Sequence, residues 1–305
     1  MAKQPRVLTG QVAAITGGAR GIGRAMAYAF VRQGMRVAIG DLDVEAAQRT
    51  AQEIGAGTVA LPLDVTDRAS VDRFVADVEA AHGPIDVYVN NAGIMSLSPL
   101  VDESDDAARR MVDINLHGVL HGMKAVLPGM IARNRGHIVN VASQAGKIGF
   151  PGGATYSATK FAVVGLSEAA RGELRLMGAD GVWLSVVMPA IVATELGGGL
   201  SKPVGQKELR PEDVADATVD ALRTGRFEVW IPNENRALFT ATSIVPRRAR
   251  EGLARALRTD RPLWDVDVER RRDYELRAAR SEPALAAAPD AAELPAGERE
   301  RETAS

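Results

Sequence analysis

Short apolar runs that alternate with helix-like segments constrain the fold of this chain more than any other feature of its sequence. The runs are Val12–Ile15, Arg36–Asp41, Gly57–Leu63, Ile85–Val89, His137–Val141, Val182–Met188 and Phe227–Ile231. The helix-like segments include Ser70–Ala81, Ser104–Arg133, Tyr156–Met177 and Pro211–Arg223. Alternation of this kind is typical of a parallel sheet with right-handed crossovers and helices on both faces. The sequence therefore predicts an α/β fold with a single doubly wound parallel sheet.

The length of the chain fits one such domain with an extension. The sequence has 305 residues, enough for an α/β domain of about 250 residues and an additional segment. We assign residues 1–246 to a Rossmann-like domain and residues 247–280 to a basic, helical extension. Residues 281–305 are rich in Ala, Pro and Glu without periodicity, and they are expected to form a disordered tail.

The extension is more basic than the rest of the chain. It holds eleven arginines against seven acidic residues, with the apolar side chains Leu253, Leu257, Leu263 and Trp264 between them. Such a segment is ordinarily a solvated helix packed on its domain. It can also be an amphipathic segment that makes a weak contact with a membrane surface or covers an apolar substrate mouth. The sequence leaves these alternatives open.

Composition excludes several classes of function. The formal net charge is −2, so the chain has no global field that recruits nucleic acid. It has no cysteine, which removes disulfides, thiolate metal sites and cysteine nucleophiles. No signal-like apolar stretch opens the sequence, and nowhere do about eighteen apolar residues run together. We therefore expect a soluble, cytoplasmic protein.

The first apolar run leads directly into a glycine-rich turn. After Ile15 the chain reads Thr16-Gly17-Gly18-Ala19-Arg20-Gly21-Ile22-Gly23, and a helical pattern follows. Where a strand, such a turn and a helix follow one another, glycines let the backbone approach a pyrophosphate and the helix N-terminus attracts the anion. Three residues separate Gly17 from Gly21, whereas one residue separates the first two glycines of the usual dinucleotide fingerprint.

An acidic residue at the end of the second apolar run strengthens this interpretation. Asp41 lies about twenty residues beyond the turn, where a carboxylate can accept hydrogen bonds from an adenosine ribose. The same carboxylate would repel a 2′-phosphate, which favours NAD over NADP. Arg20 argues the other way, because a basic residue in the turn can receive that phosphate. Leu42 and Asp43, which follow Asp41, are not basic, so we predict NAD.

Tyr156 and Lys160 form a second constellation with chemical meaning. Their four-residue spacing places the phenol and the ammonium one turn apart on the same helix face. A phenol titrates near pH 10, and a fixed cation beside it favours the phenolate, so we expect a lowered pKa suited to acid–base work. Ser143, thirteen residues before the tyrosine, could hydrogen-bond a substrate carbonyl.

With these motifs in place, the chain resembles the short-chain dehydrogenase/reductase family over about residues 8–235. The glycine-rich turn matches the cofactor turn of that family, and Ser143, Tyr156 and Lys160 match its catalytic residues. Asn115 falls where the family keeps a helix asparagine. Asn90-Asn91-Ala92-Gly93 is similar to the segment that steadies the central strands. The sequence departs from the family at Pro189-Ala190, where Pro-Gly is common.

The resemblance implies a seven-stranded sheet in the order 3-2-1-4-5-6-7 and an NAD(P)-dependent oxidoreductase that interconverts a secondary alcohol and a ketone. It implies that Tyr156 is the general acid–base, that Lys160 lowers its pKa and holds the nicotinamide ribose, and that Ser143 orients the substrate oxygen. Asn115 would anchor a water that relays protons. The expected cofactor-binding residues are Gly17, Arg20, Gly21, Ile22, Gly23, Asp41, Asp64, Val65, Asn91, Ala92, Gly93, Tyr156, Lys160, Pro189, Val192 and Thr194.

No metal site is expected. His117 and His121 are four residues apart on a predicted helix, but no third ligand stands at a telling spacing, and Gly118 lies where a metalloprotease has its glutamate. A role in the core or in an interface fits these histidines better. In the family this helix and the helix of Tyr156 commonly form a subunit interface, so the resemblance implies a homodimer or homotetramer.

The substrate is predicted from the segments expected to surround the site. A lid over Ala193–Glu208 has few polar side chains in its first half, and Leu238–Pro246 can add an apolar wall. Extensions of this kind are similar to those of family members that handle lipids and steroids, so a hydrophobic alcohol or ketone is expected. The alternatives are a non-catalytic dinucleotide-binding sensor, or a scaffold that rests on residues 247–280 alone. Sensors of the family usually lose the tyrosine or the lysine, and this chain has both.

Overall fold

A parallel β-sheet forms the centre of the molecule. The computed structural model describes residues 5–200, 209–243, 245–256 and 263–280. Within these residues seven strands pair in the order β3-β2-β1-β4-β5-β6-β7, and every pairing between them is parallel. The predicted fold class and strand order are therefore confirmed. The strands are β1 (Val12–Thr16), β2 (Arg36–Asp41), β3 (Val59–Pro62), β4 (Val87–Asn90), β5 (Gly136–Val141), β6 (Val182–Pro189) and β7 (Glu228–Ile231).

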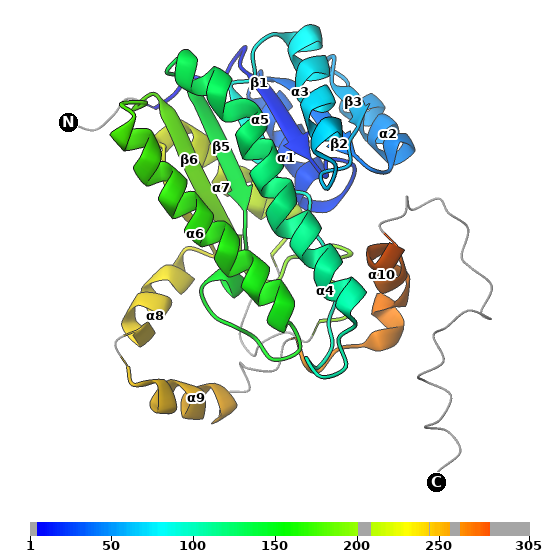
Figure 1. Ribbon diagram of the computed structural model, residues 1–305, viewed down its shortest axis with the longest axis vertical. Coiled ribbons are helices and arrows are strands. Elements are labelled where there is room, and N and C mark those ends of the chain that lie inside the picture. Colours follow the sequence, from blue (N-terminus) through cyan, green and yellow to red (C-terminus); the bar gives the residue numbers. More distant parts are fainter. Residues whose placement is uncertain (1–4, 201–208, 244, 257–262, 281–305) are drawn as a thin grey trace.

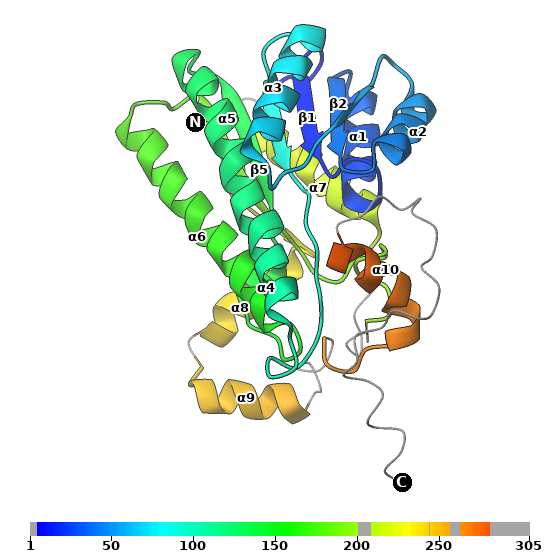
Figure 2. The same cartoon turned by 45° about the vertical axis from the view of Figure 1, so that its right-hand side comes forward.

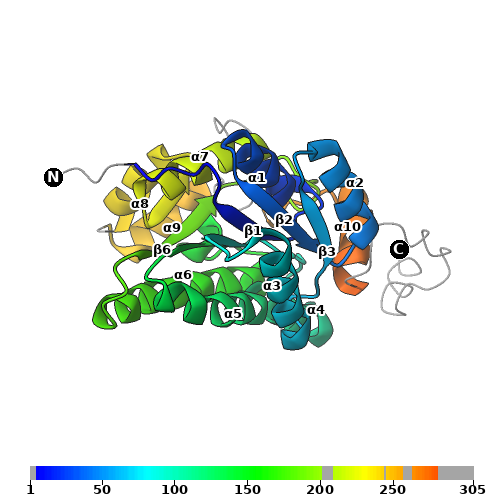
Figure 3. The ribbon, with the colours of Figure 1, turned by 90° about the horizontal axis from the view of Figure 1, so that it is seen from above.

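Helices cover both faces of the sheet (Figure 3). One layer contains α1 (Gly21–Arg32), α2 (Val44–Ile54) and α7 (Pro211–Thr224); the other contains α3 (Arg68–His82), α4 (Asp105–Val112), α5 (Gly118–Ala132) and α6 (Ala154–Leu176). Alternate residues of β1 serve the two layers, because successive side chains of a strand point to opposite faces. Ala13 and Ile15 join the core under α1, whereas Val12 and Ala14 join the core under α3 and α5.

The helix predicted over Ser104–Arg133 is not a regular α-helix throughout. A π-helical turn, Asp113–His117, separates α4 from α5, and the N–H of Gly118 bonds to the carbonyl of Asp113. The turn contains Asn115, whose side chain is fully buried and bonds sideways to Ile94 and Thr159. Periodicity could not predict this widening, because the side-chain contacts that accompany it come from distant parts of the chain. Turns of this kind are frequent at functional sites.

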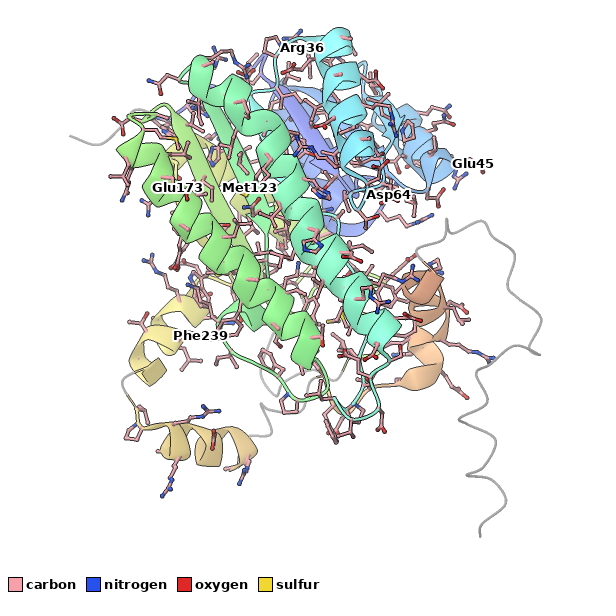
Figure 4. The ribbon with its side chains drawn as sticks, in the orientation of Figure 1. Arg36, Glu45, Asp64, Met123, Glu173 and Phe239 are labelled. Atoms are coloured by element: carbon pink, nitrogen blue, oxygen red, sulfur yellow. The ribbon has the colours of Figure 1, made fainter. Side chains whose placement is uncertain are left out.

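The predicted C-terminal helical extension is also present. Within residues 247–280 it forms α9 (Arg247–Ala256) and α10 (Val268–Arg280), and a further helix, α8 (Glu234–Ser243), lies between β7 and the extension. Figures 1 and 2 show all three beyond the end of the sheet toward which the strand arrows point. Phe239 of α8 packs on Trp230 of β7 with 4.8 Å between ring centroids (Figure 4). The predicted tail over residues 281–305 lies outside the described residues, and no described helix has the length and hydropathy needed to cross a membrane.

Glycine 122 lets α5 lie against the sheet, which gives a test of this packing. A Cβ atom at Gly122 would lie 2.3 Å from Oδ1 of Asn90 and 2.6 Å from the ring of Tyr88. We expect Gly122→Ala to lower the free energy of unfolding by about 1–3 kcal/mol, because the overlap outweighs the higher helix propensity of alanine. Chemical denaturation measures the effect.

The matched control is Gly172→Ala on the solvent side of α6, where a Cβ atom meets nothing within 4 Å. This variant should be stabilised by up to about 1 kcal/mol. Equal effects of the two substitutions would contradict the close approach of α5 to β4.

Candidate active site

The glycine-rich turn joins β1 to α1 at the carboxyl end of the strand. Gly17 has φ +64° and Gly21 has φ +52°, in the region that glycine favours. A Cβ atom at Gly23 would lie 2.2 Å from the carbonyl oxygen of Gly17, so the helix could not start this close to the strand with any other residue. No side chain caps α1 within the described residues, and its first turn has no acidic residue. The first N–H groups of α1, which no described side chain caps, can therefore receive an anionic group.

Asp41 closes β2 beside this turn. Its carboxylate accepts hydrogen bonds from the N–H groups of Ala19 at 3.0 Å and of Asp43 at 3.1 Å. Burial raises the pKa of Asp41, and these two hydrogen bonds together with the positive charge of Arg20 oppose the rise. Arg20 itself forms an ion pair with the buried carboxylate of Asp43. The one basic side chain of the turn therefore already has an acidic partner.

Asp64 and Val65 lie in the segment that follows β3 (Figure 4 labels Asp64). The carboxylate of Asp64 accepts hydrogen bonds from both the backbone N–H and the hydroxyl of Thr66, at 2.9 and 2.7 Å. Val65 packs against α5, where a Cβ atom at Gly118 would lie 2.9 Å from it. Both residues line the same cavity as the glycine-rich turn.

Asn91, Ala92 and Gly93 follow β4. The amide of Asn91 donates hydrogen bonds of 2.9 Å to the carbonyls of Thr16 and Gly17, which ties the end of β4 to the glycine-rich turn. A Cβ atom at Gly93 would lie 3.1 Å from Oδ1 of Asn115 and 3.6 Å from Nζ of Lys160. The segment therefore separates the glycine-rich turn from Asn115 and Lys160.

Tyr156 and Lys160 lie in the first two turns of α6, and both side chains are buried. The ammonium of Lys160 is 5.7 Å from the centre of the Tyr156 ring and donates a 3.0 Å hydrogen bond to the carbonyl of Val141. Ser143 follows β5, its hydroxyl donates a 3.4 Å hydrogen bond to the carbonyl of Pro189, and it lines the same cavity as Tyr156. The carboxyl end of β5 and the start of α6 thus bring the three predicted catalytic residues together.

The pKa of Tyr156 differs from the sequence-based expectation. We expected the neighbouring ammonium to lower it, but burial raises the pKa of Tyr156 to about 12. The hydrogen bond from Ser143 and the positive charge of Arg271 oppose this rise. Burial also lowers the pKa of Lys160 to about 8. The expectation was wrong because it counted the charge of Lys160 and left out the desolvation of both groups.

Asn115 lies beside this group in the π-helical turn. Its Nδ2 atom donates to the carbonyl of Ile94 at 2.9 Å and to the hydroxyl of Thr159 at 3.1 Å, and its Oδ1 atom accepts from the N–H of Ile94 at 2.9 Å. Both amide protons are therefore used to hold the segment after β4 against α6. A proton relay through a water at Asn115 stays a prediction.

The segment that follows β6 approaches the turn from the opposite side. Val192 forms an isolated bridge with Leu209, and Thr194 lies over Gly21, whose Cβ atom would be 3.3 Å from the Thr194 methyl group. Ala190 donates a 2.8 Å hydrogen bond to the carbonyl of Ile231. Its φ is not among the positive values of the described chain, so alanine in place of the usual glycine causes no backbone strain here.

A cavity of about 1610 Å³ is lined by the glycine-rich turn, by the segments that follow β4, β5 and β6, and by Tyr156 and Lys160 of α6. Of the predicted site residues only Gly23, under the turn, and Asn115, behind Gly93, do not line it. The predicted lid is described only as far as residue 200, and its described part lines the cavity through Thr194, Glu195, Leu196, Gly197 and Leu200.

His117 and His121 do not belong to the site: His117 bonds Asp113 at 3.0 Å and His121 bonds the carbonyl of Val65 at 2.9 Å.

Residues of the C-terminal extension also line this cavity, and the motifs did not reveal them. They are Arg247, Glu251, Arg255, Leu263, Tyr274, Arg277 and Ala278. Leu263 packs with Met95, Met111, Ala145 and Tyr156 in one apolar cluster. The pattern of residues 247–280 left open whether the extension is a solvated helix or covers a substrate mouth. The extension combines features of both: the described side chains of α9 are exposed, whereas Leu263, Arg271 and Ala278 are buried against the domain.

A parallel sheet with a glycine-lined turn at its carboxyl edge, next to a buried tyrosine–lysine pair, defines a Rossmann-type dinucleotide-binding protein. Comparison with known proteins gives the family. Residues 11–204 match the model of the short chain dehydrogenase family. This chain belongs to the short-chain dehydrogenase family, as the motifs of its sequence predicted.

Individual relatives show how far the similarity extends. A sorbitol dehydrogenase of Cereibacter sphaeroides is 43% identical over 226 residues, which cover 72% of this chain and 87% of the relative. A 17-beta-hydroxysteroid dehydrogenase 13 of Rattus norvegicus is 31% identical over 81% of this chain and 83% of its own length. The crystal structure of a short chain dehydrogenase/reductase from Burkholderia phymatum in complex with NAD superposes with a TM-score of 0.71 at 29% identity, covering 77% of this chain and 93% of that one.

The depressed pKa of Lys160 predicts a pH dependence of stability. Between pH 8 and 10.5 the unfolded chain binds the lysine proton more tightly than the folded one. In this window the free energy of unfolding should rise with pH by up to about 1.4 kcal/mol per unit through this group. We expect urea unfolding of the wild type, measured relative to Lys160→Met, to show this gain above pH 8 and a constant difference below it.

The variant serves as its own control, because all other titrating groups are common to both proteins. A wild-type and variant pair whose stabilities run parallel from pH 7 to 10.5 would show that Lys160 titrates normally and is not buried as described.

Proposed function

We propose that this protein is an NAD-dependent dehydrogenase that interconverts a secondary alcohol and a ketone, with Tyr156 as the general acid–base. The observation that carries the proposal is the position of the Tyr156 phenol. It is buried, and it lines the same cavity as Ser143, Lys160 and the glycine-rich turn.

The site residues have separate roles in this proposal. As an alcohol is oxidised, the ionised phenol of Tyr156 accepts the hydroxyl proton, and the hydroxyl of Ser143 holds the substrate oxygen by a hydrogen bond. Lys160 stabilises the ionised phenol and returns a proton toward solvent, with Asn115 as the anchor of the relay. The dinucleotide, when bound, supplies the two-electron acceptor for oxidation or the donor for reduction. In the reverse direction Tyr156 protonates the carbonyl oxygen.

Close backbone approach supports a bound dinucleotide. Cβ atoms at Gly17 and Gly23 would collide with Ala92 and with the Gly17 carbonyl at 2.9 and 2.2 Å, so only glycines let the turn and the start of α1 pack this closely. No described side chain caps α1, so its first N–H groups can face a pyrophosphate. Asp41, Asp64, Val65, Asn91, Ala92 and Gly93 would hold the adenosine half and the centre of the cofactor; Pro189, Val192 and Thr194 would cover the nicotinamide. We propose NAD rather than NADP because Asp41 faces the cavity and Arg20 is paired with Asp43.

The substrate that we propose has a hydrophobic scaffold. The residues in the apolar cluster of Tyr156 are Met95, Met111, Ala145 and Leu263, with Ile94, Leu97, Phe150, Leu196 and Leu200 packed against them. Apolar walls of this kind give binding energy to apolar rather than hydroxyl-rich ligands. The similarity to a sorbitol dehydrogenase favours a polyol as the second candidate, whereas the similarity to a hydroxysteroid dehydrogenase favours the first. A sensor without catalysis has less support, because both Tyr156 and Lys160 are present and buried.

We also propose a homodimer or homotetramer, located in the cytoplasm. Three large apolar side chains of α6 and its C-terminus are exposed in the single chain: Phe161, Leu176 and Met177. Phe161 lies near the start of α6, and Leu176 and Met177 lie at its end. Exposed apolar side chains along one helix fit a contact between copies. Sedimentation velocity of the full chain tests the oligomeric state directly.

Replacing Tyr156 with Phe tests the proposed chemistry. We expect turnover to fall by about 10²–10⁴-fold, because the acid–base group is lost. NADH binding, followed by fluorescence, should stay within a few-fold of the wild type. Tyr28→Phe is the matched control, since Tyr28 does not line the cavity. A Tyr156→Phe enzyme with near-normal turnover would rule out the proposed role.

A substrate screen with the preferred cofactor distinguishes the two candidate substrate classes. Steroids, retinoids and long-chain secondary alcohols should be turned over with higher kcat/KM than sorbitol or galactitol. Turnover confined to polyols would refute the hydrophobic substrate and leave the dehydrogenase assignment intact.

Asp41 tests the choice of cofactor. We expect the wild type to bind NADH more tightly than NADPH, and Asp41→Ser to move the ratio of the two dissociation constants by about tenfold or more toward NADPH, a change of about 1.4 kcal/mol. Titration calorimetry with both nucleotides measures the ratio. Equal affinity of the wild type for NADH and NADPH would overturn the assignment to NAD.

A further inference from the structure

Arg271 of α10 is the largest fully buried side chain of the described residues, with 1% of its surface exposed. It comes from the C-terminal extension, outside the residues that match the family model. A guanidinium cannot shed its charge in a protein, so complete burial is costly unless every donor finds an acceptor. The hydrogen-bond partners of Arg271 therefore show which segments of the domain the extension holds in place.

The guanidinium joins three segments that are distant in the sequence. Nη1 donates to the carbonyls of Leu196 at 2.7 Å and Gly198 at 3.0 Å, both in the loop that follows β6. Nη2 donates to the carbonyl of Met95 at 2.8 Å, in the segment that follows β4. Nε donates to Glu275 on α10 itself at 2.9 Å. One side chain thus fastens two walls of the substrate cavity to each other and to α10.

Other residues of α10 and the turn before it reinforce the same attachment. The hydroxyl of Tyr274 accepts a 2.7 Å hydrogen bond from the N–H of Met95. Arg277 forms a 2.7 Å ion pair with Glu195, and the N–H of Asp267 bonds the carbonyl of Gly199 at 2.9 Å. The loop over residues 195–199 is therefore held along its length by the extension.

Arg271 also acts electrostatically on the proposed acid–base group. Its charge is one of the two influences that oppose the rise in the pKa of Tyr156. Leu196, whose carbonyl it binds, packs against the apolar cluster that contains Tyr156. The geometry therefore gives this residue two separate effects: it closes the wall beside the substrate, and it places a second cation near the phenol.

We propose that Arg271 is a positioning residue for the reaction, which holds the loop over residues 195–199 closed on the substrate side of Tyr156 and places a positive charge on that side of the cavity. The electrostatic half of this proposal rests on the proposed function of Tyr156; the closure of the loop does not. The C-terminal extension is then part of the substrate site rather than an appendage, and the site is incomplete without it.

Hydrogen exchange of the full chain tests the closure without any substrate. In Arg271→Met, backbone amides of residues 193–200 and 94–97 should exchange at least about tenfold faster than in the wild type, because the carbonyls of Met95, Leu196 and Gly198 lose their donor. The matched control is Arg272→Met, which removes the same charge from an exposed position on the same helix. If both segments exchange at the same rates in Arg271→Met and Arg272→Met, Arg271 does not hold the loop over residues 195–199 closed.

Kinetics test the effect on the reaction. In Arg271→Met we expect KM for the alcohol to rise by about tenfold or more, and the acid limb of the kcat/KM profile for alcohol oxidation to move to higher pH, because the loss of a cation disfavours the ionised phenol. Arg271→Lys restores the charge but not the fork of donors, so it should return the pH profile toward that of the wild type while KM stays raised. A merely structural residue would change KM and leave the pH profile alone in both variants.

The outcomes remain distinguishable if a variant or the proposed function fails. NADH binding and thermal melting report whether Arg271→Met is folded; if it is not, Arg271→Lys carries both measurements, with faster exchange of residues 193–200 as its expected result. If no alcohol is turned over by the wild type, the proposed function fails and hydrogen exchange alone decides whether Arg271 closes the loop.

Discussion

The structure depends on the burial of a phenol and an ammonium side by side. Water would stabilise the charged forms of Tyr156 and Lys160, and burial removes that stabilisation, so the pKa of the phenol rises and that of the ammonium falls. The protein partly replaces water with fixed groups: the hydroxyl of Ser143, the carbonyl of Val141 and the charge of Arg271. The balance between desolvation and these groups sets how readily Tyr156 exchanges a proton.

The parallel sheet makes this arrangement possible. Because all described strands run the same way, the segments that follow β1, β4, β5 and β6 meet at one edge. The glycine-rich turn, the segment at Gly93, the hydroxyl of Ser143 and the loop over residues 195–199 therefore border a single cavity. Hydrogen bonds from Asn91 to the turn and from Asn115 to the carbonyl of Ile94 fix these neighbours against one another.

Local sequence patterns predicted what depends on local structure. The apolar runs predicted the strands, and the resemblance to a family implied their order. The four-residue spacing of Tyr156 and Lys160 predicted that both lie on one face of a helix. Features that arise from tertiary contact were not predictable. The π-helical turn at Asn115 is accompanied by side-chain bonds to residues far along the chain, and the direction of the Tyr156 pKa shift depends on burial that no spacing reports.

The burial of Arg271 is the clearest feature that the sequence could not predict. In the sequence it is the middle one of three consecutive arginines, with nothing to distinguish it from its exposed neighbours. Only the docking of α10 against Met95 and Leu196 separates a buried guanidinium from a solvated one. The extension was predicted to be helical and basic, and its contribution to the cavity became visible from its contacts.

The central proposal is that a bound, positively charged nicotinamide, together with Lys160 and Arg271, makes the buried phenol of Tyr156 ionisable under working conditions, although burial raises its pKa to about 12. Tyrosinate absorbance near 295 nm, recorded as the difference between the wild type and Tyr156→Phe across a pH titration with saturating NAD⁺, measures that ionisation directly. The account predicts a single transition that lies below the ordinary pKa of tyrosine, about 10, when the positively charged nicotinamide joins Lys160 and Arg271. A transition that stays at or above that value with the cofactor bound would contradict it.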